Sequence, residues 1–255
     1  MRLAAAALVA ALLVPSLAHA GAWPMKKGDG QVILRFERQT ADEAFDASGG
    51  LVAIPSRYDE AASTFVEYGL TNRLTLQGKL VAARGQDEFG GYEGTAPAEL
   101  GVRWAAVRRG GMVLSVYAGA ISPGEGENAV YVSRVRSEGD AELRVLFGRS
   151  GRWFGRPYFV DSQAARLMRI GAPDETRYDT SIGVDITENW LVLVQSYAGF
   201  VDGADEGLAP GWNNAELSVV RRLGSVRVQA GWRTAVAGRD STRGAGPVIA
   251  VWKRF

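Results

Sequence analysis

Short stretches of the chain alternate regularly between apolar and polar residues. Between residues 99 and 106, Leu100, Val102 and Trp104 share one face. Glu99 and Arg103 share the other. Because successive side chains of a β-strand point to opposite faces, this period of two predicts a strand with one apolar face. The alternation recurs many times, whereas a sustained helical period is hard to find, so we predict an all-β protein.

Two kinds of segment separate these stretches and alternate along the chain. The shorter ones are 71–72, 109–111, 149–156, 187–189 and 223–224. The longer ones, rich in Gly, Asp and Glu, are 41–60, 85–97, 123–139, 171–176, 202–213 and 238–246. A soluble sandwich also alternates along its strands. Alternating short turns and long loops, however, are typical of an outer-membrane barrel, with turns in the periplasm and loops outside.

The stretches between these separators are the predicted strands, near 30–40, 61–71, 73–84, 98–108, 112–122, 139–148, 157–168, 177–187, 190–201, 213–222, 225–236 and 247–255. Most are about as long as a tilted strand that crosses the hydrocarbon core. We predict one transmembrane antiparallel β-barrel of about 12 strands, whose even number puts both termini on the periplasmic side. In 157–168 Arg166 falls opposite Asp161 and Gln163, so a β-bulge or an early exit into the loop is expected there.

The first twenty residues have the pattern of an export signal. Arg2 precedes an apolar run over residues 3–14, and Ala-His-Ala at 18–20 is a small-x-small cleavage pattern. The apolar run is too short to span a bilayer as a helix, although a retained anchor is the alternative. We predict cleavage after Ala20, which divides the chain into a signal peptide, 1–20, and an outer-membrane β-barrel, 21–255.

Composition excludes most catalytic and metal chemistry. The chain has no cysteine, and its one histidine, His19, lies in the predicted signal peptide. A Ser-His-Asp triad, a Cys-His dyad and the usual zinc ligands are therefore excluded from the mature chain. The 29 basic and 28 acidic residues leave no excess charge to attract nucleic acid. We predict no catalytic residue, no metal, no cofactor and no nucleic-acid partner.

Acidic residues gather in three predicted loops, at 42–46, 125–127 and 202–206. Carboxylate oxygens suit divalent cations, but solvated acidic loops are the simpler interpretation. Carboxylates also recur on single strand faces, as in Asp140 with Glu142 and Asp179 with Asp185. Such pairs can serve acid–base catalysis. With arginines on neighbouring strands, we interpret them as lining charges that are neutralised by ion pairs.

The C-terminus resembles that of a known class of proteins. The last ten residues read GPVIAVWKRF, with Phe255 at the end and apolar Val251 and Ile249 at two-residue steps before it. This ending resembles the assembly signal of Gram-negative outer-membrane β-barrel proteins, although Lys253 stands where an apolar or aromatic residue is usual. The mature opening, GAWP at 21–24 and GDGQVI at 28–33, is similar to proteobacterial barrels described as porin-like transporters. The resemblance implies an outer-membrane location, outer-membrane lipid and lipopolysaccharide as surroundings, and the barrel-assembly machinery as a partner.

If the apolar faces meet lipid, the polar faces point inward. The pore-lining residues predicted in this way are Gln77, Lys79, Glu99, Arg103, Glu142, Arg144, Asp161, Asp179, Asp185, Glu216, Arg227 and Arg233. Barrels of about 8 strands are filled by side chains, and those of about 16 enclose water. Twelve strands leave two solutions, a hydrated pore or a dry interior of cross-strand ion pairs, and we expect the pore, with Arg103 at a hydrated position.

The sequence therefore predicts a narrow passive pore for small polar solutes in the outer membrane. The alternative is a non-conducting envelope protein whose outer loops bind a surface component or a partner. A membrane-embedded hydrolase is a third possibility, which the missing histidine disfavours.

Overall fold

The computed structural model of the protein describes residues 21–122, 138–203 and 211–255, apart from the side chains at positions 92 and 95–97. The strands are β1 (Gly30–Phe45), β2 (Leu51–Gly69), β3 (Leu74–Gln86), β4 (Gly91–Arg109), β5 (Met112–Ile121), β6 (Asp140–Trp153), β7 (Arg156–Arg169), β8 (Glu175–Asp185), β9 (Trp190–Val201), β10 (Gly211–Leu223), β11 (Val226–Arg239), β12 (Ser241–Thr242) and β13 (Ala245–Arg254). These residues contain no helix long and apolar enough to cross a membrane.

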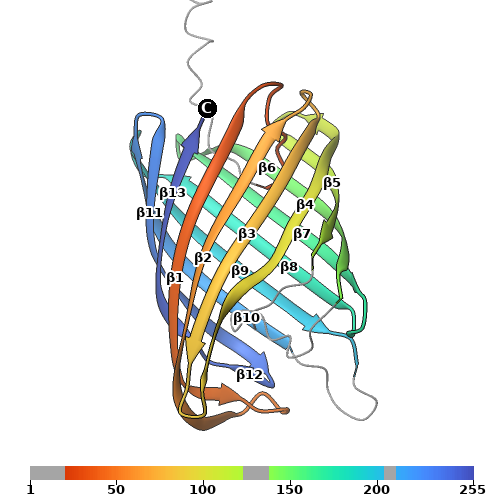
Figure 1. Cartoon of the computed structure of the whole chain (residues 1–255). Helices are drawn as coiled ribbons and strands as arrows, with labels where there is room; N and C mark the ends of the chain where they lie inside the picture. The colour runs from red at the N-terminus through yellow and green to blue at the C-terminus, as the bar shows by residue number, and fades with distance from the viewer. Residues whose placement is uncertain (1–20, 123–137, 204–210) are drawn as a thin grey trace, which may run out of the picture.

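The strands form one closed antiparallel barrel (Figure 1). From β1 to β11 each strand pairs with the next one in the sequence, and β13 pairs with both β11 and β1, which closes the wall. Among the described strands, the short β12 pairs only with the end of β1, where Ala44 lies opposite Thr242. The wall therefore has twelve strands, β1 to β11 and β13, which confirms the predicted all-β barrel.

The two ends of the barrel differ (Figure 1). We call the end that carries the C-terminus and the short hairpin turns the turn end, and the opposite one the loop end. Gly110 and Gly111, between β4 and β5, both have positive φ, as do Phe154 and Gly155 between β6 and β7. Two successive residues with positive φ make the tight turn that matches the twist of antiparallel strands. The predicted turn at 149–156 thus shortens to two residues.

Two segments that were predicted as loops, 41–60 and 85–97, are β-strand over most of their length. β1 and β2 continue to a turn at 46–50, and β3 and β4 continue to a turn at 87–90. In these extensions Glu43 pairs with Ala53, and Gly85 pairs with residue 92. Apolar alternation stops where the strands leave the apolar belt, but ladder hydrogen bonds between backbones need no apolar face. The hairpins consequently extend the wall at the loop end (Figure 1).

The bulge or early exit expected in 157–168 is also wrong, because β7 continues to Arg169. β7 pairs with β6 and β8 without a shift in register. Arg166 lies on the outer face near the loop end, where its guanidinium donates to Thr176 Oγ1 and Asp174 Oδ2, both at 2.9 Å, and to Asp202. A charged outer residue is accommodated there because carboxylates of the neighbouring loop segments neutralise it.

The wall has an apolar outer face. Leu100, Leu143 and Leu217 are exposed, as are most large apolar residues at the middle of the strands. A water-soluble monomer rarely exposes so much contiguous apolar surface. The outer apolar band of a membrane barrel contacts lipid, and this contact accounts for the exposed apolar surface.

Candidate functional site

The inner face of the wall collects the residues predicted to line a pore. Seven of them are buried: Gln77, Arg103, Glu142, Asp161, Asp185, Glu216 and Arg233. The other five are partly buried: Lys79, Glu99, Arg144, Asp179 and Arg227. That these residues line an open pore stays a prediction, because a buried position can also belong to a packed interior.

The segment 21–27 enters the barrel at the turn end. The wall binds it through Ser115 Oγ, which donates to the Ala22 carbonyl at 2.6 Å, and through Arg103, which donates to the Trp23 carbonyl at 2.7 Å. The segment also donates to the wall, because the Met25 amide donates to Thr75 Oγ1 at 2.9 Å. We call residues 21–27 the N-terminal segment, and it occupies the turn-end half of the interior.

Apolar side chains of the wall surround this segment. Trp23 packs against two clusters of buried residues, and its ring meets Phe159 edge-on with ring centroids 6.4 Å apart. The clusters contain Phe159, Leu191, Leu193, Val220, Ala250 and Trp252 on one side and Ala22, Ala105, Val113, Tyr117 and Leu146 on the other. The inner face is therefore apolar around Trp23, which polar–apolar alternation did not predict.

Close approach of the segment to the wall depends on two glycines. A Cβ added to Gly148 would lie 2.6 Å from the Trp23 ring, and one added to Gly69 would lie 2.0 Å from the Lys26 carbonyl oxygen. Larger residues at either position would push the segment away. Glycine at these two positions is the sequence feature that permits the close approach. Nothing in the sequence, however, connects residue 69 or 148 with residues 21–27.

Arg103 is fully buried rather than hydrated. Its side chain and that of Glu67 each have 0% exposure, and their ion pair spans 2.8 Å. Gln77 Nε2 also donates to Glu67 at 2.8 Å. The expectation of a hydrated Arg103 is wrong, because the N-terminal segment covers the guanidinium that the sequence left facing an empty lumen.

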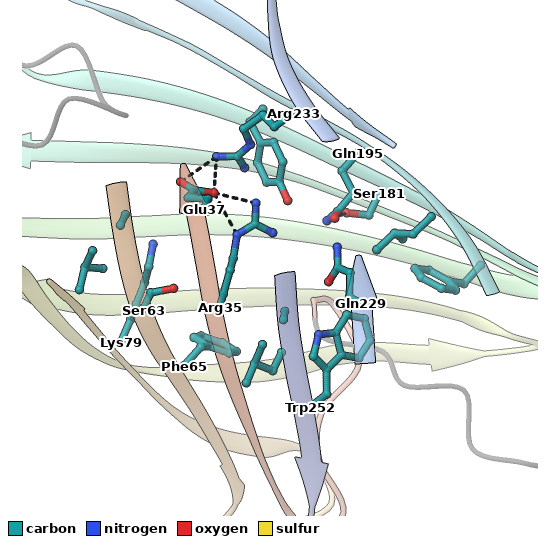
Figure 2. Close-up of a pocket in the computed structure, with 17 residues that line it drawn as sticks. Arg35, Glu37, Ser63, Phe65, Lys79, Ser181, Gln195, Gln229, Arg233 and Trp252 are labelled. Carbon is teal, nitrogen blue, oxygen red and sulfur yellow. Dashed lines mark hydrogen bonds and ion pairs between the residues drawn. The ribbon is translucent and has the colours of Figure 1, made fainter. Parts of the chain in front are cut away.

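A cavity of about 240 Å³ lies in the middle of the barrel (Figure 2). Its charged lining residues are Arg35, Glu37, Lys79 and Arg233, and its uncharged polar ones are Ser63, Ser181, Gln195, Tyr197 and Gln229. The remaining lining residues are apolar: Ile33, Ala61, Phe65, Val81, Phe159, Leu193, Ala250 and Trp252. A water molecule takes about 30 Å³ in the liquid, so the cavity has room for several waters.

Two arginines and two glutamates form an ion-pair cluster beside the cavity. Arg35 lies 2.6 Å from Glu216 and 2.8 Å from Glu37. Arg233 lies 3.2 Å from Glu37 and 3.3 Å from Glu216. Figure 2 shows Arg35 and Arg233 converging on Glu37. The four charges sum to zero, which makes their burial tolerable.

The other predicted carboxylates also have polar partners. Arg144 pairs with Glu99 at 2.5 Å and with Glu142. Gln163 donates to Asp179 at 2.8 Å, and Arg222 pairs with Asp185 at 2.5 Å. Asp140 lies 3.6 Å from Arg169. The carboxylate pairs seen in the sequence are thus held by ion pairs and hydrogen bonds, as interpreted from the neighbouring arginines.

The C-terminal residue lies at the seam where the barrel closes. The Gly30 amide donates to the Phe255 carbonyl at 2.8 Å, and the Phe255 amide donates to the Gly30 carbonyl at 3.1 Å. Lys253, the departure from the apolar pattern, donates through Nζ to Ser225 Oγ at 2.6 Å. Its long stem lets the ammonium group reach the turn end.

Of the acidic loop groups, only part lies within the described residues. Glu43 pairs with Arg243 across β1 and the loop after β12. Asp46 accepts hydrogen bonds from Ser48 and Gly50 in the β1–β2 turn, and its pKa is lowered chiefly by the Ser48 side chain. Asp202 binds Arg166. The groups at 125–127 and 205–206 lie outside the described residues.

No sequence-family model and no characterised protein sequence matches the chain. Solved structures do match. An outer membrane channel from Pseudomonas putida F1, described as the COG4313 channel, superposes with a TM-score of 0.71 at 12% identity, over 94% of this chain and all (100%) of that one. The translocator domain of the autotransporter NalP from Neisseria meningitidis has a TM-score of 0.53 at 11% identity, over 94% and 91% of the two chains. The β domain of the Bordetella autotransporter BrkA has a TM-score of 0.51 at 13% identity, over 90% and 100%. The chain therefore has the fold of outer-membrane β-barrels.

Proposed function

We propose that this protein is a narrow passive pore for small polar solutes in the outer membrane. In this proposal the signal peptide, 1–20, is removed and the turn end faces the periplasm. Lipid and lipopolysaccharide surround the apolar outer face, and the barrel-assembly machinery binds the C-terminal strand that ends at Phe255. The observation that carries the proposal is the central cavity of about 240 Å³, whose lining places four charged and two amide side chains beside apolar ones.

The N-terminal segment is the moving part of the proposed pore. It occupies the turn-end half of the interior, and five residues of the wall and its turns hold it by side-chain hydrogen bonds: Asn72, Thr75, Arg103, Ser115 and Asp161. A solute that enters the cavity from the loop end passes to the turn end when this segment shifts. Removing the segment should therefore enlarge the conductance.

Single-channel recording in planar bilayers tests the proposal. The mature chain from Gly21 should show small discrete openings, and a chain that begins at Gly28 should show larger ones. Arg35→Gln leaves Glu37 and Glu216 with Arg233 as their shared basic partner, so it should shift the reversal potential in a salt gradient toward cation preference. Arg166→Gln, on the outer face, is the matched control and should leave the reversal potential unchanged.

A non-conducting envelope protein is the second candidate, and one observation favours it. The turn-end interior is packed with two clusters of buried apolar residues around Trp23. Silence of a folded barrel that begins at Gly28, together with silence of the chain from Gly21, would contradict the pore. The loop-end hairpins would then be the surface to probe for a binding partner.

A further inference from the structure

Gly21 lies against a buried carboxylate inside the barrel. Asp161 is 5% exposed on the inner face of β7. Its Oδ2 atom accepts a hydrogen bond from the Ala22 amide at 2.5 Å. A Cβ added to Gly21 would lie 2.3 Å from the same oxygen atom. The backbone at Gly21 and Ala22 therefore reaches across the lumen to one specific side chain of the wall.

Few other groups are placed to neutralise the charge of the Asp161 carboxylate. In the described part of the chain, the Ala22 amide is the one donor that bonds to this carboxylate. Arg103, the basic residue nearby, forms its ion pair with Glu67 at 2.8 Å and donates to the Trp23 carbonyl. A buried carboxylate without a cation is expensive, so a protein normally pairs such a group.

We propose that the α-ammonium group of Gly21, released by cleavage after Ala20, forms a buried ion pair with Asp161 and so locks the N-terminal segment in the barrel. The inference rests on the cleavage site of the proposed function. The nitrogen of Gly21 lies within about 5 Å of the Asp161 carboxylate, because bond lengths and angles set the Cβ–N separation near 2.5 Å. Cleavage thus creates a positive charge beside a carboxylate that forms no ion pair within the described part of the chain.

The site selects glycine at this position. Any side chain on residue 21 would overlap the Asp161 carboxylate, and Gly21 has a φ of +128°, a backbone conformation that other residues rarely adopt. A retained signal peptide would leave residue 21 with a neutral amide in place of the ammonium group. The lock therefore forms only after the chain has been exported and processed.

Labelling of the α-amine in the folded, exported barrel tests the proposal. Intact mass first shows whether the mature chain begins at Gly21, and a different start overturns the proposal. An aldehyde reagent selective for α-amines should then modify the wild-type barrel about tenfold more slowly than the Asp161→Asn barrel, since the loss of one charge-assisted contact changes an opening equilibrium by at least about that factor. Asp179→Asn, which also removes an interior carboxylate, is the matched control and should label like the wild type.

A second variant keeps the test decisive if Asp161→Asn does not fold. A chain refolded with one extra methionine before Gly21 retains Asp161 but moves the ammonium group by one residue, so its α-amine should also label faster. Equal rates in all of these folded barrels, as judged by heat-modifiable migration, would overturn the ion pair. Labelling does not depend on conduction, so a protected α-amine in a silent barrel would contradict the pore and leave the ion pair standing.

Discussion

Glu216 and Leu217 are neighbours at the middle of β10, and their side chains lie on opposite faces of the barrel wall. Glu216 is 2% exposed and pairs with Arg35 at 2.6 Å across the interior, whereas Leu217 is 60% exposed on the outer face. One residue of sequence therefore separates the interior ion pairs from the surface that contacts lipid, because side chains alternate along a strand.

A charge at Leu217 should destabilise the barrel. Leu217→Arg should lower the free energy of unfolding by roughly 2–4 kcal/mol, the cost of an arginine facing lipid near the bilayer midplane. Leu223→Arg on the same strand is the control. Leu223 lies at the turn end, where the cost falls to about 0–1 kcal/mol. Denaturant unfolding in lipid vesicles measures both, and equal costs would mean that the outer face is not embedded in lipid.

The ion pair between Arg103 and Glu67 should behave as a buried pair. Arg103→Met leaves Glu67 buried without its cation and should cost about 3–5 kcal/mol of unfolding free energy. The double variant Arg103→Met/Glu67→Gln removes both charges and should recover part of that loss. A double-mutant cycle by denaturant unfolding measures the coupling. Additive effects would show that the two side chains are hydrated and independent.

Phe255 should be needed for insertion into the outer membrane. Its backbone pairs with Gly30 at the seam, and its ring lies so close to Gly30 that a Cβ there would be 2.4 Å away. Phe255→Asp should leave the protein unassembled in the periplasm. Phe154→Asp, which changes another exposed aromatic residue at the turn end, should assemble normally. Membrane fractionation and heat-modifiable migration report both, and normal assembly of Phe255→Asp would contradict the assembly signal.

The contact between Arg166 and Asp202 should weaken in acid. The hydrogen bond from Arg166 lowers the pKa of Asp202. A lowered folded-state pKa means that this contact stabilises the protein above the ordinary Asp value of about 3.9 and is lost as the pH falls through the folded-state pKa. Carboxylate NMR titration should show a rise in the pKa of Asp202 in Arg166→Gln.

Asp46 supplies the internal reference for that titration. Its lowered pKa depends chiefly on the Ser48 side chain, so Arg166→Gln should leave it unchanged. A pKa of Asp202 that did not move in Arg166→Gln would show that the two side chains do not interact in solution.

Several features of the fold could be predicted from local sequence. The twelve strands, the outward position of residues such as Leu100 and Leu217, and the inward position of Glu142 and Glu216 follow from alternation, which depends on each strand alone. Strand ends were less predictable. The extensions of β1 to β4 at the loop end are held by backbone pairing, which is independent of the polarity of the side chains.

The sequence by itself determined the all-β class and the face on which most strand residues lie, because these depend on short-range periodicity. Only the tertiary structure decided what fills the interior. Ala22 meets Asp161, which is 139 residues away in the chain, and Trp23 lies between two clusters built from distant strands. Such contacts exist only after the barrel has closed around the N-terminal segment, so no local pattern encodes them. For that reason the burial of Arg103, the apolar surroundings of Trp23 and the position of the central cavity all required the structure.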